Sequence, residues 1–138
     1  MQVKCKYTLG SDLPPKALKG KGFKSTNFNL EIGALYSVYS IVLINGVVRY
    51  LTLDRWQTVP FWYPAELYTI EDPLLPPGWY FKYFFPPTCV GVEALWGYKE
   101  MIFDSQHFND LIEREDEAVR TFIKRKEEID SWNEAQPG

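Results

Sequence analysis

The sequence is poor in the residue types from which most catalytic and metal sites are built. Its 138 residues include one histidine, His107, and two cysteines, Cys5 and Cys89, which lie far apart and fit no metal-ligand spacing. It has no glycine-rich phosphate loop, since Gly20-Lys21-Gly22 lacks the other positions of a nucleotide-binding fingerprint. We therefore expect no catalytic residue, no cofactor and no metal, with His107 at the surface or its boundary and both cysteines as free thiols.

Long apolar runs are also lacking. The longest, Ile41 to Ile44, has the length of a β-strand, whereas a membrane helix needs roughly 18 apolar residues. The segment Met1 to Lys6 has no apolar stretch behind its charges, so we expect no signal peptide and a cytoplasmic protein without membrane contact. With 46% hydrophobic residues, the chain has enough apolar surface to fold as one domain of ordinary size.

Charge is unevenly distributed along the chain, although the net charge is only −3. Residues 1–26 carry a net +5, residues 27–103 a net −3 and residues 104–138 a net −5. Either the two ends attract each other and keep the domain in solution, or one charged patch meets a charged partner. The lysines between 19 and 24 could contact phosphate as point charges, and a solvated basic loop is the simpler interpretation.

The middle of the chain has strand-like patterns. Residues 35–44 and 47–53 are rich in β-branched and aromatic side chains, and Asn45-Gly46 separates them. Asn-Gly between two apolar runs predicts a hairpin, because a type I′ turn needs positive φ at both central residues. Three further strands are predicted, over 66–71, 79–85 and 90–101, the last bent at Gly97.

Helical spacing dominates the C-terminal part. Phe108, Leu111 and Ile112 share one helical face, and residues 118–123 repeat the pattern. The acidic stretch 113–117 breaks the apolar stripe, which predicts two helices, or one bent helix, with a solvated acidic elbow. Asp104 or Ser105 is expected to cap the first turn.

These patterns predict an α+β protein that is mainly β, namely a small antiparallel (SH3-like) barrel or bent sheet with one or two C-terminal helices packed on it. We expect four successive segments: a basic N-terminal segment, partly loop, over 1–27; a β domain over 28–103; C-terminal helices over 104–132; and a frayed tail over 133–138.

Aromatic residues are the strongest functional signal. The chain has 23 of them, and eleven fall between Trp56 and Phe85. In a strand over 79–85, side chains alternate between two faces, and both faces would be mostly aromatic. One face can join the core, so the other must be covered by the helices or be exposed as a binding patch.

Pro60 and Pro64 flank Phe61-Trp62-Tyr63, which predicts a stiff loop that cannot be a central strand. Trp and Tyr in rigid loops are typical of recognition surfaces, although packing in a core is their more common role. We predict partner contacts for the aromatic residues and electrostatic steering for the acidic ones in the set Phe61, Trp62, Tyr63, Trp79, Glu113, Glu115, Asp116 and Glu117.

Three other function classes were weighed. A small ligand or carbohydrate could stack on Trp62, Tyr63 and Trp79. A hydrolase would need paired carboxylates, for which the candidates are Asp54, Glu66, Glu71 and Asp72. Binding of nucleic acid by stacking needs basic residues among the aromatic ones. Residues 56–85 contain a single basic residue, Lys82, so no nucleic-acid partner is expected.

Several short motifs carry a resemblance to a known group of proteins. They are Phe28-x-Leu30-x-Ile32-Gly33-x-x-Tyr36-x-Val38-Tyr39-x-Ile41, Tyr50-Leu51-x-Leu53-Asp54, Pro60-x-Trp62-Tyr63-Pro64-x-x-Leu67-x-x-Ile70-x-Asp72, Trp79-x-Phe81, Ala94-x-Trp96 and Phe103-Asp104. Over residues 28 to about 128 the chain resembles small bacterial proteins of unassigned function that are grouped with immunity proteins of polymorphic toxin systems. The glycine before a Tyr-x-Val strand is also similar to the start of SH3-like barrels.

The resemblance implies a non-enzymatic binding protein or inhibitor of another protein, and no catalytic residues carry over from it. The acidic C-terminal part would suit a basic partner such as a nuclease toxin. A monomer and a homodimer are both compatible with the surplus of aromatic surface.

Overall fold

The central hairpin forms where the Asn-Gly turn predicts it. In the computed structural model, which describes residues 1–18, 26–56 and 59–136, Asn45 and Gly46 have φ of 50° and 77°. They join β3 (Ser40–Ile44) to β4 (Val47–Leu53), with Ile44 opposite Val47. The predicted first strand, 35–44, is divided, because Leu35–Ser37 forms a separate strand, β2, that joins another sheet.

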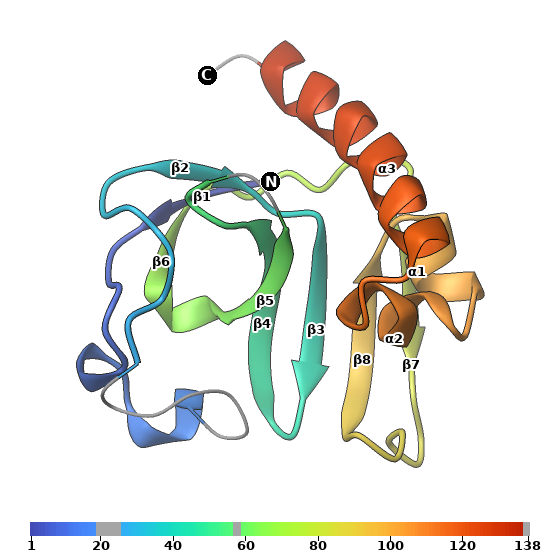
Figure 1. Cartoon of the computed structure of the whole chain (residues 1–138), viewed down its shortest axis with the longest axis horizontal. Coiled ribbons are helices and arrows are strands. Elements are labelled where there is room, and N and C mark those ends of the chain that lie inside the picture. Colours follow the sequence, from blue (N-terminus) through green and yellow to red (C-terminus); the bar gives the residue numbers. More distant parts are fainter. Residues whose placement is uncertain (19–25, 57–58, 137–138) are drawn as a thin grey trace.

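Two antiparallel sheets organise the described residues (Figure 1). The first has the order β2-β1-β6, and it contains β1 (Gln2–Cys5) and β6 (Tyr68–Asp72) beside β2. The second has the order β5-β4-β3-β8-β7. Its remaining strands are β5 (Pro60–Pro64), β7 (Tyr80–Tyr83) and β8 (Val92–Gly97).

The chain becomes helical sooner than expected. The strand predicted over 90–101 ends at Gly97, and α1 (Lys99–Phe103) follows it. Asp104 accepts a hydrogen bond from the backbone N–H of Gln106 at 3.0 Å, just before α2 (His107–Ile112). The elbow then leads into α3 (Asp116–Ala135), so the interpretation as two separate helices is confirmed. Short 3-10 turns complete the structure: η1 (Gly10–Asp12), η2 (Pro15–Leu18) and η3 (Ala65–Leu67).

Two apolar cores lie on opposite faces of the five-stranded sheet. On one face, Val42, Leu51 and Leu95 pack against the three α-helices, with Phe122 of α3 fully buried among them. On the other face, residues of β4 and β5 pack against the three-stranded sheet and the N-terminal segment. Strand β4 is covered on both faces between residues 49 and 53, all of which are buried.

The predicted fold class is therefore confirmed: the protein is α+β and mainly β, with bent antiparallel sheets and C-terminal helices. The sheets bend without closing into a barrel. The basic N-terminal segment is partly loop, as expected, but it also supplies β1, in which Val3 and Cys5 are buried. Lysines 19, 21 and 24 lie outside the described residues.

The C-terminal tail is more ordered than predicted, since α3 continues to Ala135. Asn133, placed in a frayed tail from sequence, is buried and accepts a hydrogen bond from the Met1 amino group at 3.0 Å. Its amide nitrogen donates to Ser37 Oγ at 2.9 Å, so the last turn of α3 is tied to β1 and β2. No helix of the described chain has both the length and the apolar character needed to cross a membrane.

Candidate binding surfaces

The segment from Pro60 to Pro64 is an edge strand, not the loop that its prolines suggested. Its residues pair with β4, with Trp62 opposite Leu51 and Tyr63 opposite Tyr50. Proline is tolerated at both ends because an edge strand leaves every second N–H without a ladder partner. The expectation that this segment is not a central strand is confirmed, and the expectation of a loop is wrong.

Because side chains alternate between the two faces of a strand, the three aromatic residues of β5 lie in different environments. Trp62 points into the helix-side core, where its ring lies 5.4 Å from that of Phe108, and it is only 5% exposed. Tyr63 points into the other core against Phe28. Phe61 alone remains partly exposed. Trp62 and Tyr63 therefore stabilise the fold and are not offered to a partner or to a sugar.

The structure does bring Phe61 next to the acidic elbow. The Arg114 guanidinium lies over the Phe61 ring, 4.8 Å from its centroid, and also donates to the carbonyl of Leu111 at 3.1 Å. Arg114 itself has a φ of 62°, which turns the chain between α2 and α3. The four acidic residues chosen from the sequence are all exposed here, namely Glu113, Glu115, Asp116 and Glu117.

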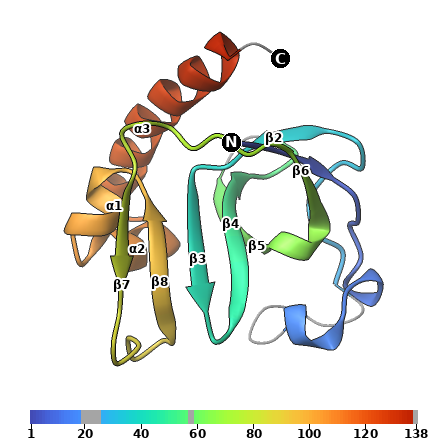
Figure 2. The same cartoon turned by 180° about the vertical axis from the view of Figure 1, so that it is seen from behind.

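The strand predicted over 79–85 carries an exposed aromatic face, and this face continues onto β8 and β3. We name this surface the open face; its residues are not among the partner-binding residues predicted from the sequence. It lies on the side of β3, β8 and β7 that faces away from the helices. Figure 2 shows β7 and β8 in front of the helices, with β3 beside β8. Ile41, Trp96 and Phe81 are register partners in one row across it, and Leu43, Ala94 and Tyr83 form the next. Val48 of β4 lies opposite Leu43.

The open face is exposed at β7 and at the start of β4, whereas Ile41 is partly buried against the second core and Ala94 is buried. Phe81 and Tyr83 are 54% and 63% exposed, and Val48 is also exposed. The rings of Phe81 and Trp96 lie 5.0 Å apart. Within the two register rows just described, no residue is charged. Of the two faces expected for the 79–85 strand, the one with Phe81 and Tyr83 is exposed. The other is only partly covered, since Tyr80 and Lys82 are exposed and Phe84 packs against the helix-side core.

The outer edge of β7 is a second feature of this region. The backbone N–H of Phe84 donates to the carbonyl of Glu93 at 2.8 Å. Because bonded and non-bonded pairs alternate along an antiparallel ladder, the backbone groups of Phe81 and Tyr83 point away from β8. Strand β7 is the last in the order of its sheet, so these groups lie at a free sheet edge.

Trp79 stands between the two cores and contacts both. It also lines a cavity of about 200 Å³ together with Trp132 and Arg125 of α3, under the segment that joins β6 to β7. Its indole Nε1 is buried and meets no acceptor among the described residues. Trp79 and Trp132 thus line one cavity, which is separate from Phe61 and the elbow.

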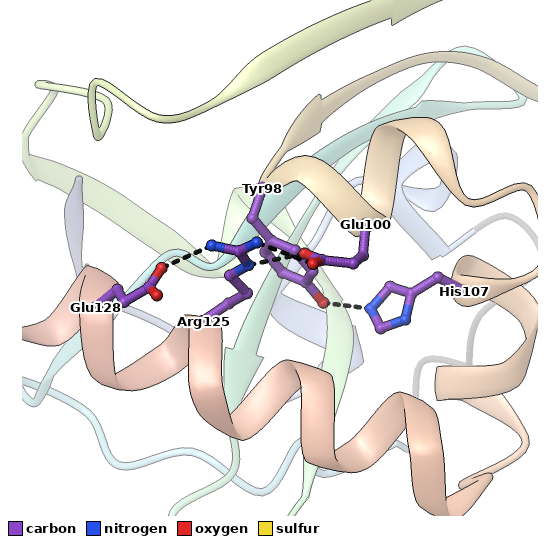
Figure 3. A network of polar contacts seen from close by, with 5 residues as sticks. All are labelled: Tyr98, Glu100, His107, Arg125 and Glu128. Carbon is purple, nitrogen blue, oxygen red and sulfur yellow. Dashed lines mark hydrogen bonds and ion pairs between the residues drawn. The ribbon is translucent and has the colours of Figure 1, made fainter.

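The single histidine lies in the interior, which corrects the expectation of a surface or boundary position. His107 is 3% exposed, and its Nε2 lies 2.6 Å from the hydroxyl of Tyr98 (Figure 3). Burial lowers the pKa of His107, and carboxylates including Glu100 oppose that effect in part. Burial raises the pKa of the Tyr98 hydroxyl. The pair is a buried neutral contact that joins α2 to the end of β8.

A bidentate ion pair lies beside this contact. Arg125 of α3 donates to both carboxylate oxygens of Glu100 at 2.7 and 2.9 Å, and to Glu128 at 2.9 Å. The guanidinium lowers the pKa of Glu100 to about 2. Two parallel charge-assisted bonds fix the angle between α1 and α3.

The four carboxylates considered for hydrolysis lie in three different places. Asp54 lines a cavity between β2 and α3, whereas Glu71 and Asp72 line another near the N-terminus. Glu66 lies near Arg49. Asp54, Glu66 and Asp72 are thus not brought together, and Glu71, which lines the same cavity as Asp72, forms an ion pair with Lys4.

Both cysteines are free thiols, as predicted. Cys5 is buried, donates to the carbonyl of Tyr7 at 3.3 Å, and has a pKa raised by burial. Cys89 is exposed. Over the ranges 1–18, 26–56 and 59–136, no three His, Cys, Asp or Glu side chains gather closely enough to hold a metal ion.

Comparison of the chain with protein-family models, with curated proteins and with solved structures found no match. The resemblance to immunity proteins therefore rests on the motifs quoted from the sequence. Any statement about function has to come from the surfaces described above.

Proposed function

We propose that this chain is a non-catalytic, inhibitor-like protein that binds another protein through the open face. The observation that carries the proposal is the pair of uncharged register rows that include Phe81 and Tyr83, each more than half exposed. Exposed apolar patches of this kind are characteristic of interaction sites, because leaving them in water costs free energy that a partner recovers. Aromatic side chains contribute most per residue to such contacts.

The partner needs an apolar and uncharged contact surface. A charge buried against Phe81, Trp96 and Tyr83 would lose its hydration without gaining a counter-charge, which is costly. The acidic elbow cannot supply that counter-charge, since it packs on β5, at the opposite edge of the five-stranded sheet from β7. A basic partner, as expected from the sequence, would instead have to use Phe61 and the elbow.

Quantitative affinity capture with three matched baits separates these surfaces. The first bait is the unchanged chain, and the second carries Phe81→Ser with Tyr83→Ser. The third carries Trp56→Ser, because Trp56 is 66% exposed and lies outside the open face, so it matches the loss of an exposed aromatic side chain.

A partner retained by the first and third baits and lost from the second supports the proposal, provided that the purified pair then binds with the same selectivity. A partner that survives the open-face substitutions overturns the assignment of this surface. A partner lost only when Glu113, Glu115 and Asp116 are changed to glutamine would move the interface to the elbow and favour a basic protein.

A second candidate function is supported by the cavity under the β6–β7 segment. Trp79 and Trp132 provide apolar walls, and Arg125 and Glu128 provide polar groups. A sugar combines apolar faces with hydroxyl acceptors, which matches this lining. Of the three residues predicted to stack on a sugar, Trp79 thus remains a candidate, whereas Trp62 and Tyr63 are buried.

Intrinsic tryptophan fluorescence tests that candidate directly. Titration with a panel of mono- and disaccharides should change the emission of the unchanged chain and leave that of the Trp132→Ala variant unaltered. No saturable change with any sugar in the panel would contradict the carbohydrate hypothesis and leave the protein-binding proposal untouched.

A further inference from the structure

The sheet edges of this protein are protected unequally. Strand β5 begins and ends with proline, and the elbow packs against it through Phe61. Strand β2 lies beside α3, and β6 carries Glu71, paired with Lys4, and Asp72. Proline, charge and covering elements are the usual means by which proteins prevent a sheet edge from pairing with another chain.

Strand β7 lacks most of these protections. Its sequence is Tyr80-Phe81-Lys82-Tyr83, without proline, and all four residues are exposed. Lys82 is its one charged residue, and it lies over the ring of Phe84, 5.1 Å from the centroid, on the helix side of the sheet. The outward backbone groups of Phe81 and Tyr83 are therefore accessible to another strand.

We propose that two copies of the chain pair antiparallel through their β7 strands and form one continuous ten-stranded sheet. The pairing is self-complementary, because a two-fold axis normal to a sheet relates an edge strand to an antiparallel copy of itself. The same axis keeps the open faces of both copies on one side. The dimer would thus join two open faces into one larger surface, which extends the proposed function without depending on it.

The exposed area along this edge suits a weak but specific dimer. Five aromatic side chains border it, namely Tyr80, Phe81, Tyr83, Phe85 and Phe103, with exposures from 45% to 84%. Since a Phe or Tyr side chain has roughly 200 Å² of surface, together they expose about 600 Å². A standard interface buries about 800 Å² on each partner. An edge contact leaves the outer parts of these side chains on the two open faces, so the dimer interface is smaller than that and the dimer is weak.

Charge limits the register of the pairing. A two-fold axis through Lys82 would place two ammonium groups opposite each other, which is unfavourable. An axis through Phe81 or Tyr83 avoids that contact, and it also places outward hydrogen-bonding groups at the centre. Side-chain alternation excludes an axis between two residues, because opposed residues must lie on the same face.

Sedimentation equilibrium of the purified chain tests the pairing without any partner protein. Between about 1 and 100 µM, the range expected for an interface of this size, the mass should rise from 16.1 kDa toward twice that value. Tyr83→Pro removes an outward N–H that bonds nothing in β8, so the variant should remain monomeric at every concentration. Tyr83→Ala keeps that N–H and should retain part of the association.

Two further variants keep the test decisive. Tyr83→Glu adds like charges near the axis and leaves the backbone unchanged, so it too should abolish the dimer. Lys82→Ala changes the same strand without touching an outward backbone group, and it should dimerise as well as the unchanged chain.

Circular dichroism melting curves establish that each variant is folded. A monomer at all concentrations, or a dimer that persists in both Tyr83→Pro and Tyr83→Glu, would overturn the inference. Affinity capture through the open face by a monomeric chain would overturn the dimer alone and leave the proposed function standing. A dimer that captures no partner would overturn the proposed function and leave the dimer standing.

Discussion

Phe81 and Trp96 face each other across β7 and β8 with ring centroids 5.0 Å apart, and solvent reaches more than half of the Phe81 surface. Trp62, in the same sheet, is 5% exposed beneath Phe108. Aromatic residues of this sheet are thus buried where the helices or the second core cover it, as at Trp62 and Tyr63, and exposed toward its β7 edge.

This difference predicts that two substitutions lower the free energy of unfolding by unequal amounts. Trp62→Ala should lower the free energy of unfolding by about 3–5 kcal/mol, because it leaves a cavity in a closely packed core. Tyr83→Ala should change it by less than about 0.5 kcal/mol, because the side chain is 63% exposed. Urea unfolding followed by circular dichroism measures both. Equal losses in the two variants would show that the open face is covered in the folded protein.

How far the sequence predicts this arrangement depends on the range of the interactions involved. Asn45-Gly46 determines its own turn, so the hairpin follows from two adjacent residues. The helical spacing around Phe108 and Phe122 is also local, and both helices form where it indicates. Proline at 60 and 64 is equally typical of a loop and of an edge strand, and only pairing with β4 decides between them.

Burial is harder to predict than secondary structure. Trp62 and Tyr83 have similar strand-like surroundings in the sequence, yet one is covered by α2 and the other by nothing in the described structure. The sequence predicts His107 at the surface or its boundary, whereas the turn of α2 directs it to Tyr98. These outcomes depend on which elements pack together, and no local pattern contains that information.

The ion pair between Glu100 and Arg125 predicts a loss of acid stability. The pKa of Glu100 is about 2 in the folded chain, against an ordinary value of 4.5. The unfolded chain therefore takes up this proton first, and the stabilisation present above pH 4.5 is lost as the pH falls toward 2. Glu100→Gln should cost about 1–2 kcal/mol at neutral pH, since the carboxylate is partly exposed.

Urea unfolding at pH values from neutral to strongly acidic measures that effect. The variant and the unchanged chain should converge in stability as Glu100 becomes protonated. Glu128→Gln is the matched control, because it removes a single bond to Arg125 from a more exposed carboxylate, and it should cost less. A constant difference between Glu100→Gln and the unchanged chain at every pH would contradict the assignment.

The burial of His107 predicts a second decrease in the free energy of unfolding as the pH falls. Burial favours the neutral imidazole, so its pKa in the folded chain lies below 6.5, the ordinary value. As the pH falls below 6.5, the unfolded chain binds this proton more readily than the folded one, and the free energy of unfolding decreases. Because the sequence has one histidine, its NMR signal can be followed without ambiguity.

Titration of the imidazole by NMR measures that pKa, and His107→Gln provides the control. The variant should be less stable at neutral pH, yet its stability should no longer decline between pH 6.5 and the range where carboxylates titrate. An imidazole that titrates above 6.5 would show that its charged form is stabilised instead, and it would contradict the buried neutral contact with Tyr98.

The contact between Phe61 and Arg114 predicts a measurable coupling across the elbow. The guanidinium lies 4.8 Å from the ring centroid and is only partly exposed, so the interaction should stabilise the fold by about 0.5–1 kcal/mol. A double-mutant cycle with Phe61→Leu and Arg114→Gln isolates that coupling from the loss of each side chain. Urea unfolding at low salt provides the four free energies.

A parallel cycle with Phe61→Leu and Arg120→Gln serves as the control, since Arg120 pairs with Glu117 and has no ring contact with Phe61. Its coupling should be close to zero. Coupling of equal size in both cycles would mean that general charge, not the ring contact, holds the elbow against β5. In that case Phe61 and the acidic residues would be free to move apart, and the elbow would not hold them in one fixed arrangement for a partner.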